Sequence, residues 1–370
     1  MTIFERLGVR TLINAAGAKT RLGGVRPREE VVSAMLEASD LSVDLAELQD
    51  KASAVIARHT GAEAGYVTSG AAAALTLAAA ACIAGDDPVV IDALPHTDGV
   101  ANEIVIARRH RNAYDHAWRA AGARLVEVGI DDRDAGSGMR GVEPWEYEAA
   151  FGPQTVAVAY VARAEQDPPL EEVLAVAHRH GIPVIVDAAA RLPPASNLRA
   201  FVEAGADLVA FSGGKAIRGP QASGILCGRV DLIRSALLSH LDMDQPTPHW
   251  QLPPGLFPDG SKQPLPRHGV GRALKVGKEQ IAGLLVALEA FALEDPSARV
   301  RVHEQFLATI AAALEGVPGA AVQTVSAPER VRLAIAFDHP GNAAQVYLNL
   351  LRGTPGIAVD PSGARRGVLH

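Results

Sequence analysis

Short apolar runs alternate with amphipathic helical patterns along most of the chain. Helical patterns such as Leu170–His180 and Leu198–Ala204 are each followed by a glycine, which is a common helix end. The alternation predicts an α/β fold with a mostly parallel sheet and crossover helices. Such sheets bind ligands beyond the carboxyl ends of their strands. The predicted strands are Tyr66–Thr68, Pro88–Asp92, Glu103–Ala107, Arg124–Val128, Thr155–Val161, Pro183–Asp187, Asp207–Phe211 and Ala222–Cys227.

The pattern changes after the last of these strands. Asp244–Pro266 is rich in proline and predicts a long loop. A long helix is expected over Ala273–Leu293, followed by a smaller α+β segment with strands at Val322–Val325 and Val331–Phe337. The chain stops in what resembles the start of a strand, where we expected a closing helix. We therefore expect either a longer natural chain or an atypical C-terminus.

These changes in the pattern predict that the chain has an N-terminal arm and two domains. Residues 1–45 form an arm that contributes to the active site and to the smaller domain. Residues 46–270 form the large ligand-binding domain, and residues 271–370 form the smaller C-terminal domain. A chain of 370 residues is long enough for this organisation.

Composition and charge argue against several classes of function for this sequence. The formal net charge is −7, which disfavours binding to nucleic acid. Cys82 and Cys227 lie in apolar runs without Cys or His at metal-ligand spacing, so we predict free thiols and no metal. The N-terminus has no export signal, and the longest apolar run, Ala71–Ala84, is too short to cross a bilayer. We predict a cytoplasmic protein that binds no membrane.

The first candidate for chemistry is Lys215, which follows a predicted buried strand and two glycines. A lysine in this setting can be an ordinary solvated turn residue. A nucleotide phosphate loop is excluded, because Val209 and Ala216 stand where that motif needs Gly and Ser or Thr. A lysine beside apolar strands can be desolvated, which lowers the pKa of its amine and favours Schiff-base formation.

Two further segments fit the same chemistry. Asp187 ends a buried strand; it is either a helix cap or a carboxylate that keeps a pyridine nitrogen protonated. Thr68 and Ser69 precede the start of an Ala-rich helix, where their hydroxyls and the N–H groups of Gly70 and Ala71 predict an anion site or a simple N-cap. The order of anion site, strand-end Asp and Gly-flanked Lys favours an enzyme that uses pyridoxal 5′-phosphate (PLP).

At these residues the chain resembles the PLP enzymes related to bacterial selenocysteine synthase, most closely the D-glucosaminate-6-phosphate ammonia-lyase branch. The resemblance implies an aspartate-aminotransferase-like fold and an active site at a homodimer interface. The matching stretches are Ile13–Gly17, Val67–Ala73, Asp187–Pro194, Phe211–Gln221 and Gly271–Glu279.

The resemblance also implies roles for single residues. Lys215 would carry PLP as a Schiff base, with Asp187 at the pyridine nitrogen. Gln221 would support the lysine loop, and His110 is the candidate for stacking on the ring, although an exposed basic turn is the alternative. The cofactor phosphate would be held by Ser69, Gly70, Ala71 and Ser212.

Three cations are candidates for binding an anionic substrate. Arg272 and Lys275 fall at the start of the predicted helix Ala273–Leu293, where positive charge opposes the helix dipole, which favours a bound anion. Arg21 lies near the N-terminal motif, where an exposed arginine is the alternative.

The predicted function is a lyase that removes the β-hydroxyl of an amino acid or amino sugar acid and yields a 2-oxo acid and ammonia. D-glucosaminate 6-phosphate is the leading candidate substrate. Selenium transfer is not expected, since we see no tRNA-binding extension and the net charge is negative. Racemase, aldolase or aminotransferase activity and a catalytically silent PLP-binding protein remain alternatives.

Overall fold

The computed structural model describes residues 1–130, 141–163, 168–241, 252–258, 260, 264–327 and 329–370. The chain divides into a larger unit, Arg26–Ala292, and a smaller unit made of Met1–Val25 and Leu293–His370. Across the described ranges, no helix combines the length and the apolar character that a membrane span requires. Each unit is described separately.

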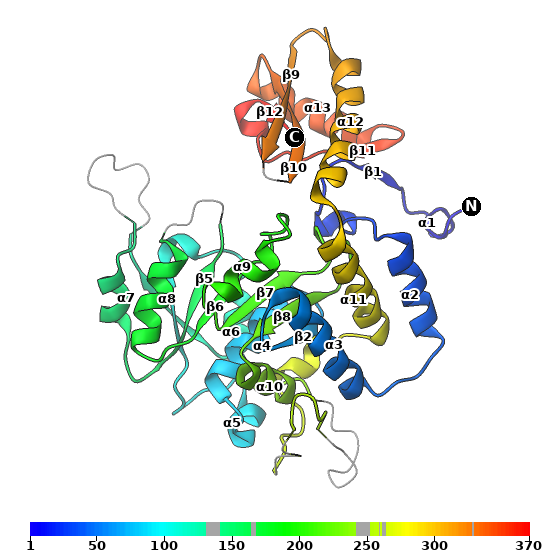
Figure 1. Cartoon of the computed structure of the whole chain (residues 1–370). Helices are drawn as coiled ribbons and strands as arrows, with labels where there is room; N and C mark the ends of the chain where they lie inside the picture. The colour runs from blue at the N-terminus through cyan, green and yellow to red at the C-terminus, as the bar shows by residue number, and fades with distance from the viewer. Residues whose placement is uncertain (131–140, 164–167, 242–251, 259, 261–263, 328) are drawn as a thin grey trace. The chain divides into compact units, whose positions relative to one another are not determined.

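The larger unit contains a seven-stranded sheet in the order β2-β8-β7-β6-β5-β3-β4 (Figure 1). Strand β8 runs antiparallel to β2 and β7, and the remaining neighbouring strands of this sheet are parallel. The predicted α/β class with a mostly parallel sheet is therefore confirmed. The strands are β2 (Ala64–Thr68), β3 (Glu103–Ala107), β4 (Arg124–Val128), β5 (Thr155–Val161), β6 (Val184–Asp187), β7 (Leu208–Ser212) and β8 (Gly224–Gly228).

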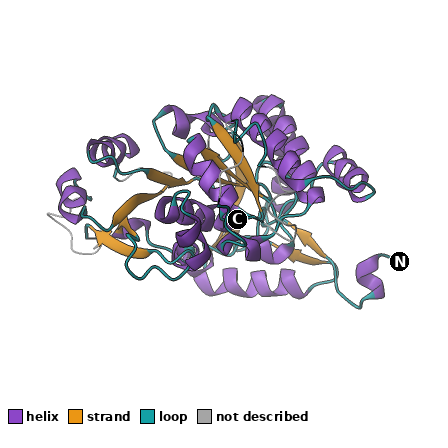
Figure 2. Ribbon diagram, turned by 90° about the horizontal axis from the view of Figure 1, so that it is seen from below, coloured by secondary structure: helices purple, strands orange, loops and turns teal. Residues whose placement is uncertain are grey.

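Alternate residues of each strand enter two separate cores, because successive side chains point to opposite faces of a sheet. In β7, Val209 and Phe211 belong to one core, whereas Leu208 and Ala210 belong to the other. Helices cover both faces of the sheet (Figure 2). The helices of the larger unit are α2 (Glu29–Ser39), α3 (Leu45–Thr60), α4 (Ala71–Ala84), α5 (Pro88–Ala93), α6 (Asp115–Ala120), α7 (Pro144–Ala150), α8 (Leu170–Arg179), α9 (Asn197–Glu203), α10 (Val230–Leu238) and α11 (Lys278–Leu293).

One predicted strand is wrong. Pro88–Asp92 lies in helix α5, whose N-cap is Asp87. The Asp87 side chain accepts hydrogen bonds from the backbone N–H groups of Val89 and Val90, at 2.8 and 3.4 Å. An Asp followed by Pro is a helix-start signal, and here it outweighs the apolar run that predicted a strand.

The long helix also begins later than predicted. Val270–Leu274 forms a short 3-10 helix, Lys275 leaves helical geometry, and α11 starts only at Lys278. Arg272 and Lys275 therefore precede the helix, and our helix-dipole argument for a bound anion does not apply to them. In the Pro-rich stretch, residues 252–258 form neither helix nor strand, and Leu256 and Phe257 are buried in the core.

The smaller unit joins the two ends of the chain. Strand β1 (Leu12–Asn14) pairs in parallel with β11 (Gly356–Ala358). A second, antiparallel sheet has the order β12-β10-β9. Its strands and the remaining elements of the unit are β9 (Ala320–Ala327), β10 (Arg330–Phe337), β12 (Val368–Leu369), α1 (Ile3–Arg6), α12 (Pro296–Leu314) and α13 (Pro340–Arg352).

The unit boundaries differ from the predicted domain limits at residues 45 and 270. Residues 26–45 and 271–292 belong to the larger unit, because Ile281, Leu284 and Phe291 of α11 are buried in its core. Residues 1–25 belong to the smaller unit, because β1 pairs there with β11. The role of residues 1–45 in an active site remains a prediction.

Candidate active site

The predicted cofactor residues of the larger unit follow strands that share one sheet. Ser69 follows β2, Asp187 ends β6, and Lys215 follows β7. These three strands run in the same direction, since β8 is antiparallel to both β2 and β7 and β6 is parallel to β7. The three residues therefore lie along the same carboxyl edge, which is the ligand edge of such sheets.

Lys215 lies in a tight loop after β7. The Arg218 N–H donates to the Lys215 carbonyl at 3.0 Å, and Arg218 itself has a positive φ of 62°. A Cβ on Gly214 would come within 2.8 Å of the Cα and Oε1 atoms of Gln221, so this position has no room for a larger residue. Gln221 thus packs against the lysine loop, and the Lys215 side chain is partly buried.

Asp187 is 8% exposed, and its Oδ1 accepts a hydrogen bond from the Ala189 N–H at 3.0 Å. Burial raises the pKa of Asp187; the Ala189 hydrogen bond and the Lys215 charge act in the opposite direction. Lys215 is therefore close enough for its charge to act on this carboxyl. A buried carboxylate gains stability from a cationic partner, which a protonated pyridine nitrogen would provide.

The start of α4 has the features of an anion site. Its N-cap is Gly70, with a φ of 150° and no side-chain capping bond, and open space surrounds the position of a Cβ there. Ser69 and Ala71 are partly exposed, so the first N–H groups of the helix can reach a phosphate. Thr68 is buried, and its hydroxyl donates to the Gly70 carbonyl at 2.9 Å, which stabilises this turn; its role toward a cofactor stays a prediction.

His110 follows β3 on the same edge and is 1% exposed, so the alternative of an exposed basic turn is wrong. Its ring packs edge-to-face on Tyr160, with 4.7 Å between centroids, and its Nδ1 accepts the Val161 N–H at 3.4 Å. Burial, together with the charges of Arg163 and Arg109, lowers the pKa of His110 to about 4. The imidazole is therefore neutral near pH 7, with its proton on Nε2.

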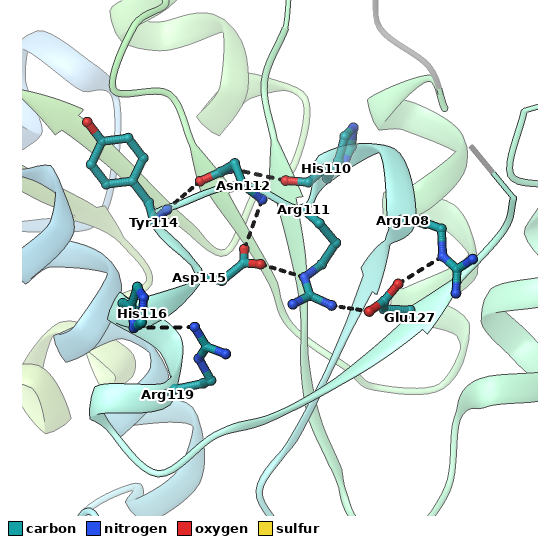
Figure 3. Close-up of polar contacts among 9 residues, drawn as sticks. All are labelled: Arg108, His110, Arg111, Asn112, Tyr114, Asp115, His116, Arg119 and Glu127. Atoms are coloured by element: carbon teal, nitrogen blue, oxygen red, sulfur yellow. Dashed lines mark hydrogen bonds and ion pairs between the residues drawn. The ribbon is translucent and has the colours of Figure 1, made fainter. Parts of the chain in front are cut away.

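A polar network holds the turn that carries His110 (Figure 3). Buried Asp115 accepts hydrogen bonds from Arg111 Nε at 2.5 Å and from the Asn112 N–H at 3.3 Å. The Asn112 side chain donates to the His110 carbonyl at 3.1 Å. Arg111 also pairs with Glu127 on β4. Sequence reasoning missed Asp115, because Arg111 precedes α6 and the pair forms across a turn rather than within a helix.

Arg272 and Lys275 occupy a different region of the larger unit. They line a cavity of about 410 Å³ beside the edge strand β2. Among the described residues that line it, none belongs to the lysine loop, the α4 start or the Asp187 segment. The same cavity contains Tyr66, whose hydroxyl hydrogen-bonds to His240 Nδ1 at 3.0 Å. The sequence did not predict a role for Tyr66 or His240, because an apolar strand and the end of a helix give no sign that the two side chains meet.

Arg21 lies in the smaller unit. It donates to the Tyr347 hydroxyl at 2.9 Å, near an ion pair of 3.0 Å between Lys19 and Asp360. These residues line a cavity of about 280 Å³ within that unit. The role of Arg21 toward a substrate stays a prediction.

The sheet order, with an Asp at the end of β6 and a Gly-flanked Lys after β7, matches the PLP-dependent transferase-like fold. Comparison with known proteins then gives the family. The model of the L-seryl-tRNA selenium transferase family matches residues 12–242, so the chain belongs to this family. The predicted family and fold class are thereby confirmed.

Three relatives are similar over most of the chain. D-glucosaminate-6-phosphate ammonia lyase of Salmonella typhimurium is 32% identical over 78% of this chain and 70% of its own length. A solved structure of D-glucosaminate-6-phosphate ammonia-lyase superimposes with a TM-score of 0.80 and 29% identity, covering 100% of this chain and 92% of that one. A 5'-C-glycyluridine monooxygenase-decarboxylase of a Streptomyces species is 31% identical over 96% of this chain and 83% of its own length.

Proposed function

We propose that this chain is a PLP-dependent ammonia-lyase that acts on a 2-amino-3-hydroxy acid. The observation that carries the proposal is that buried Asp187 and Lys215 lie at the carboxyl ends of neighbouring parallel strands, on the sheet edge that also holds the open start of α4. The similarity to D-glucosaminate-6-phosphate ammonia lyase supports the type of reaction. Related families are PLP-dependent, which supports the cofactor.

The residues fit PLP as follows. Ser69, Gly70, Ala71 and Ser212 would hold its phosphate, and Asp187 would face its ring nitrogen. Gln221 supports the loop of Lys215, which would carry the cofactor, and His110 would stack on the ring. When bound, PLP stabilises the negative charge that develops at the substrate Cα.

The protein's own task is then to move protons. The substrate amine would replace Lys215 on the cofactor, and the freed Lys215 amine would then take the proton from Cα of the substrate. The β-hydroxyl leaves as water after it is protonated by Lys215 or a neighbouring group. The resulting enamine hydrolyses to a 2-oxo-3-deoxy acid and ammonia, so the reaction needs no oxidant.

The reaction is tested by incubating holoenzyme with D-glucosaminate 6-phosphate and with a panel of D- and L-β-hydroxy amino acids. We expect equal amounts of ammonia and 2-oxo acid from the sugar acid. Exchange of the Cα proton with deuterium, without ammonia, would instead identify a racemase. A cofactor that shows neither turnover nor a spectral change with any amino acid would identify a silent binding protein.

A second candidate function is oxidative decarboxylation of an amino acid. It is favoured by the relative named a 5'-C-glycyluridine monooxygenase-decarboxylase, which matches almost the entire chain. The same incubations distinguish the two functions: this reaction consumes O₂ and releases CO₂, whereas the lyase reaction does neither.

A second copy of the chain is the proposed partner. Around α2, large apolar side chains are exposed, among them Val32 at 53% and Leu36 at 67%. The apolar stretch continues to Val43 and Leu45, which line the cavity of Arg272 and Lys275. Covering this surface in a homodimer would bury apolar area and would present Arg272 and Lys275 to the active site of the other subunit, as phosphate ligands.

The shared site is tested by mixing two impaired variants, Lys215→Ala and Arg272→Ala. If the site combines both subunits, each mixed dimer has one intact site, and co-expression restores about a quarter of the wild-type activity. The control is the mixture of Lys215→Ala with Asp187→Asn, which cannot restore activity because both positions belong to one chain. The absence of recovery in the first mixture would mean that Arg272 serves its own chain or has no role.

A further inference from the structure

Two arginines on the ligand edge of the sheet have no role in the site described so far. Arg163 lies two residues beyond the end of β5, and Arg191 lies four residues beyond the end of β6. These strands are parallel neighbours, and Val161 pairs with Asp187 in their register. Arg163 and Arg191 therefore follow neighbouring parallel strands at the same edge of the sheet, and Arg191 follows the strand that Asp187 ends.

Their side chains are partly buried and unpaired. Within the part of the chain that the structure describes, neither guanidinium makes a hydrogen bond or ion pair. Arginines elsewhere, such as Arg111, Arg179 and Arg229, pair with carboxylates. A guanidinium that loses solvent without gaining a partner costs free energy, which an oxyanion ligand would offset.

The two charges act on one pair of rings. The Arg163 charge helps burial to lower the pKa of His110. Burial and the Glu171 charge, opposed by the Arg191 charge, raise the pKa of Tyr160 to about 12. The His110 and Tyr160 rings are in contact, so the two charges act on one ring pair, which includes the proposed ring-stacking residue.

We propose that Arg163 and Arg191 bind the α-carboxylate of the substrate. This inference rests on the proposed function only in requiring an amino acid substrate; it applies equally to elimination, racemisation or decarboxylation. A planar guanidinium can hold a carboxylate through two parallel hydrogen bonds, which fixes the orientation of the bonds at Cα. Arg272 and Lys275 would then bind the phosphate of the substrate.

The test uses three probes that lack the amine and therefore cannot react. Gluconate has only the carboxylate, glucitol 6-phosphate has only the phosphate, and gluconate 6-phosphate has both. Their dissociation constants are measured by calorimetry with wild-type holoenzyme and with Arg163→Gln and Arg191→Gln. Arg163→Lys retains the charge without the two-pronged geometry. Arg179→Gln is the matched control, because Arg179 lies at the opposite edge of the sheet, where it pairs with Glu148.

We expect Arg163→Gln and Arg191→Gln to weaken the binding of both gluconates about tenfold to a hundredfold, the range for a lost charged hydrogen bond. Glucitol 6-phosphate should bind unchanged, Arg163→Lys should recover part of the loss, and Arg179→Gln should behave like the wild type. A loss confined to the phosphate probes, an equal loss for all three probes, or unchanged binding would overturn the carboxylate site. So would a wild-type protein that binds neither gluconate.

Failure of the lyase proposal gives a different result. In that case gluconate binding still depends on Arg163 and Arg191, whereas D-glucosaminate 6-phosphate releases no ammonia. The carboxylate site then stands, and only the reaction assigned to it changes.

Discussion

Replacing Lys215 with alanine should lower turnover by about 10³-fold or more, because one side chain both carries the cofactor and moves the proton at Cα. Wild-type protein should be yellow, and borohydride should attach the cofactor to the peptide that contains Lys215, as mass spectrometry would show. The variant should show no such attachment. The partly buried loop and the influence of the Lys215 charge on Asp187 are the structural grounds for this expectation.

The control for this experiment is Lys51→Ala. Lys51 is exposed and pairs with Asp50 at 3.5 Å, so its loss should leave both colour and turnover unchanged. Recovery of the borohydride label on a lysine other than Lys215 would refute the assignment.

Asp187→Asn should keep the cofactor bound but lower turnover by about 10²-fold or more, the usual cost of removing a preorganised electrostatic partner. Asparagine can still accept the Ala189 N–H through its side-chain oxygen, so the local turn should survive. What is lost is the negative charge that stabilises a protonated ring nitrogen. Turnover and the absorption spectrum of the bound cofactor are the two measurements.

The matched control is Asp231→Asn, which makes the same change in an exposed carboxylate that pairs with Arg229. Its turnover should equal that of the wild type. If Asp187→Asn also turned over normally, Asp187 would be a cap for Ala189 and nothing more.

Strands that are buried on both faces could be predicted well from the sequence. The bounds of β3 and β5 coincide with the predicted ranges, because continuous apolar runs between turn residues are characteristic of parallel sheets. The errors arose where a local signal competed with an apolar pattern. The Asp87-Pro88 helix start and the break before Lys278 are both of this kind.

In the candidate site, too, some residues could be predicted from the sequence and others could not. The placement of Lys215 and Asp187 at the carboxyl edge of the sheet was predictable, because Asp187 ends a recognisable strand and Lys215 follows another. The proposed pairing of Arg163 with Arg191 was not, because it depends on β5 and β6 being neighbours, and neighbouring strands are not apparent from one sequence. The cavity that contains Tyr66 and His240 was missed for the same reason, since 174 residues separate the two side chains.

The parallel pairing of Leu12–Asn14 with Gly356–Ala358 has a consequence for folding during synthesis. The larger unit is one continuous segment, so the ribosome can release all of it before translation ends, and it can fold as it emerges. The smaller unit cannot do so, because β1 pairs with β11, which is synthesised more than 300 residues later. Contacts over such a distance close slowly, so the smaller unit should be the last part of the protein to acquire its structure. A chaperone that holds the first 25 residues during translation would therefore act on this unit alone.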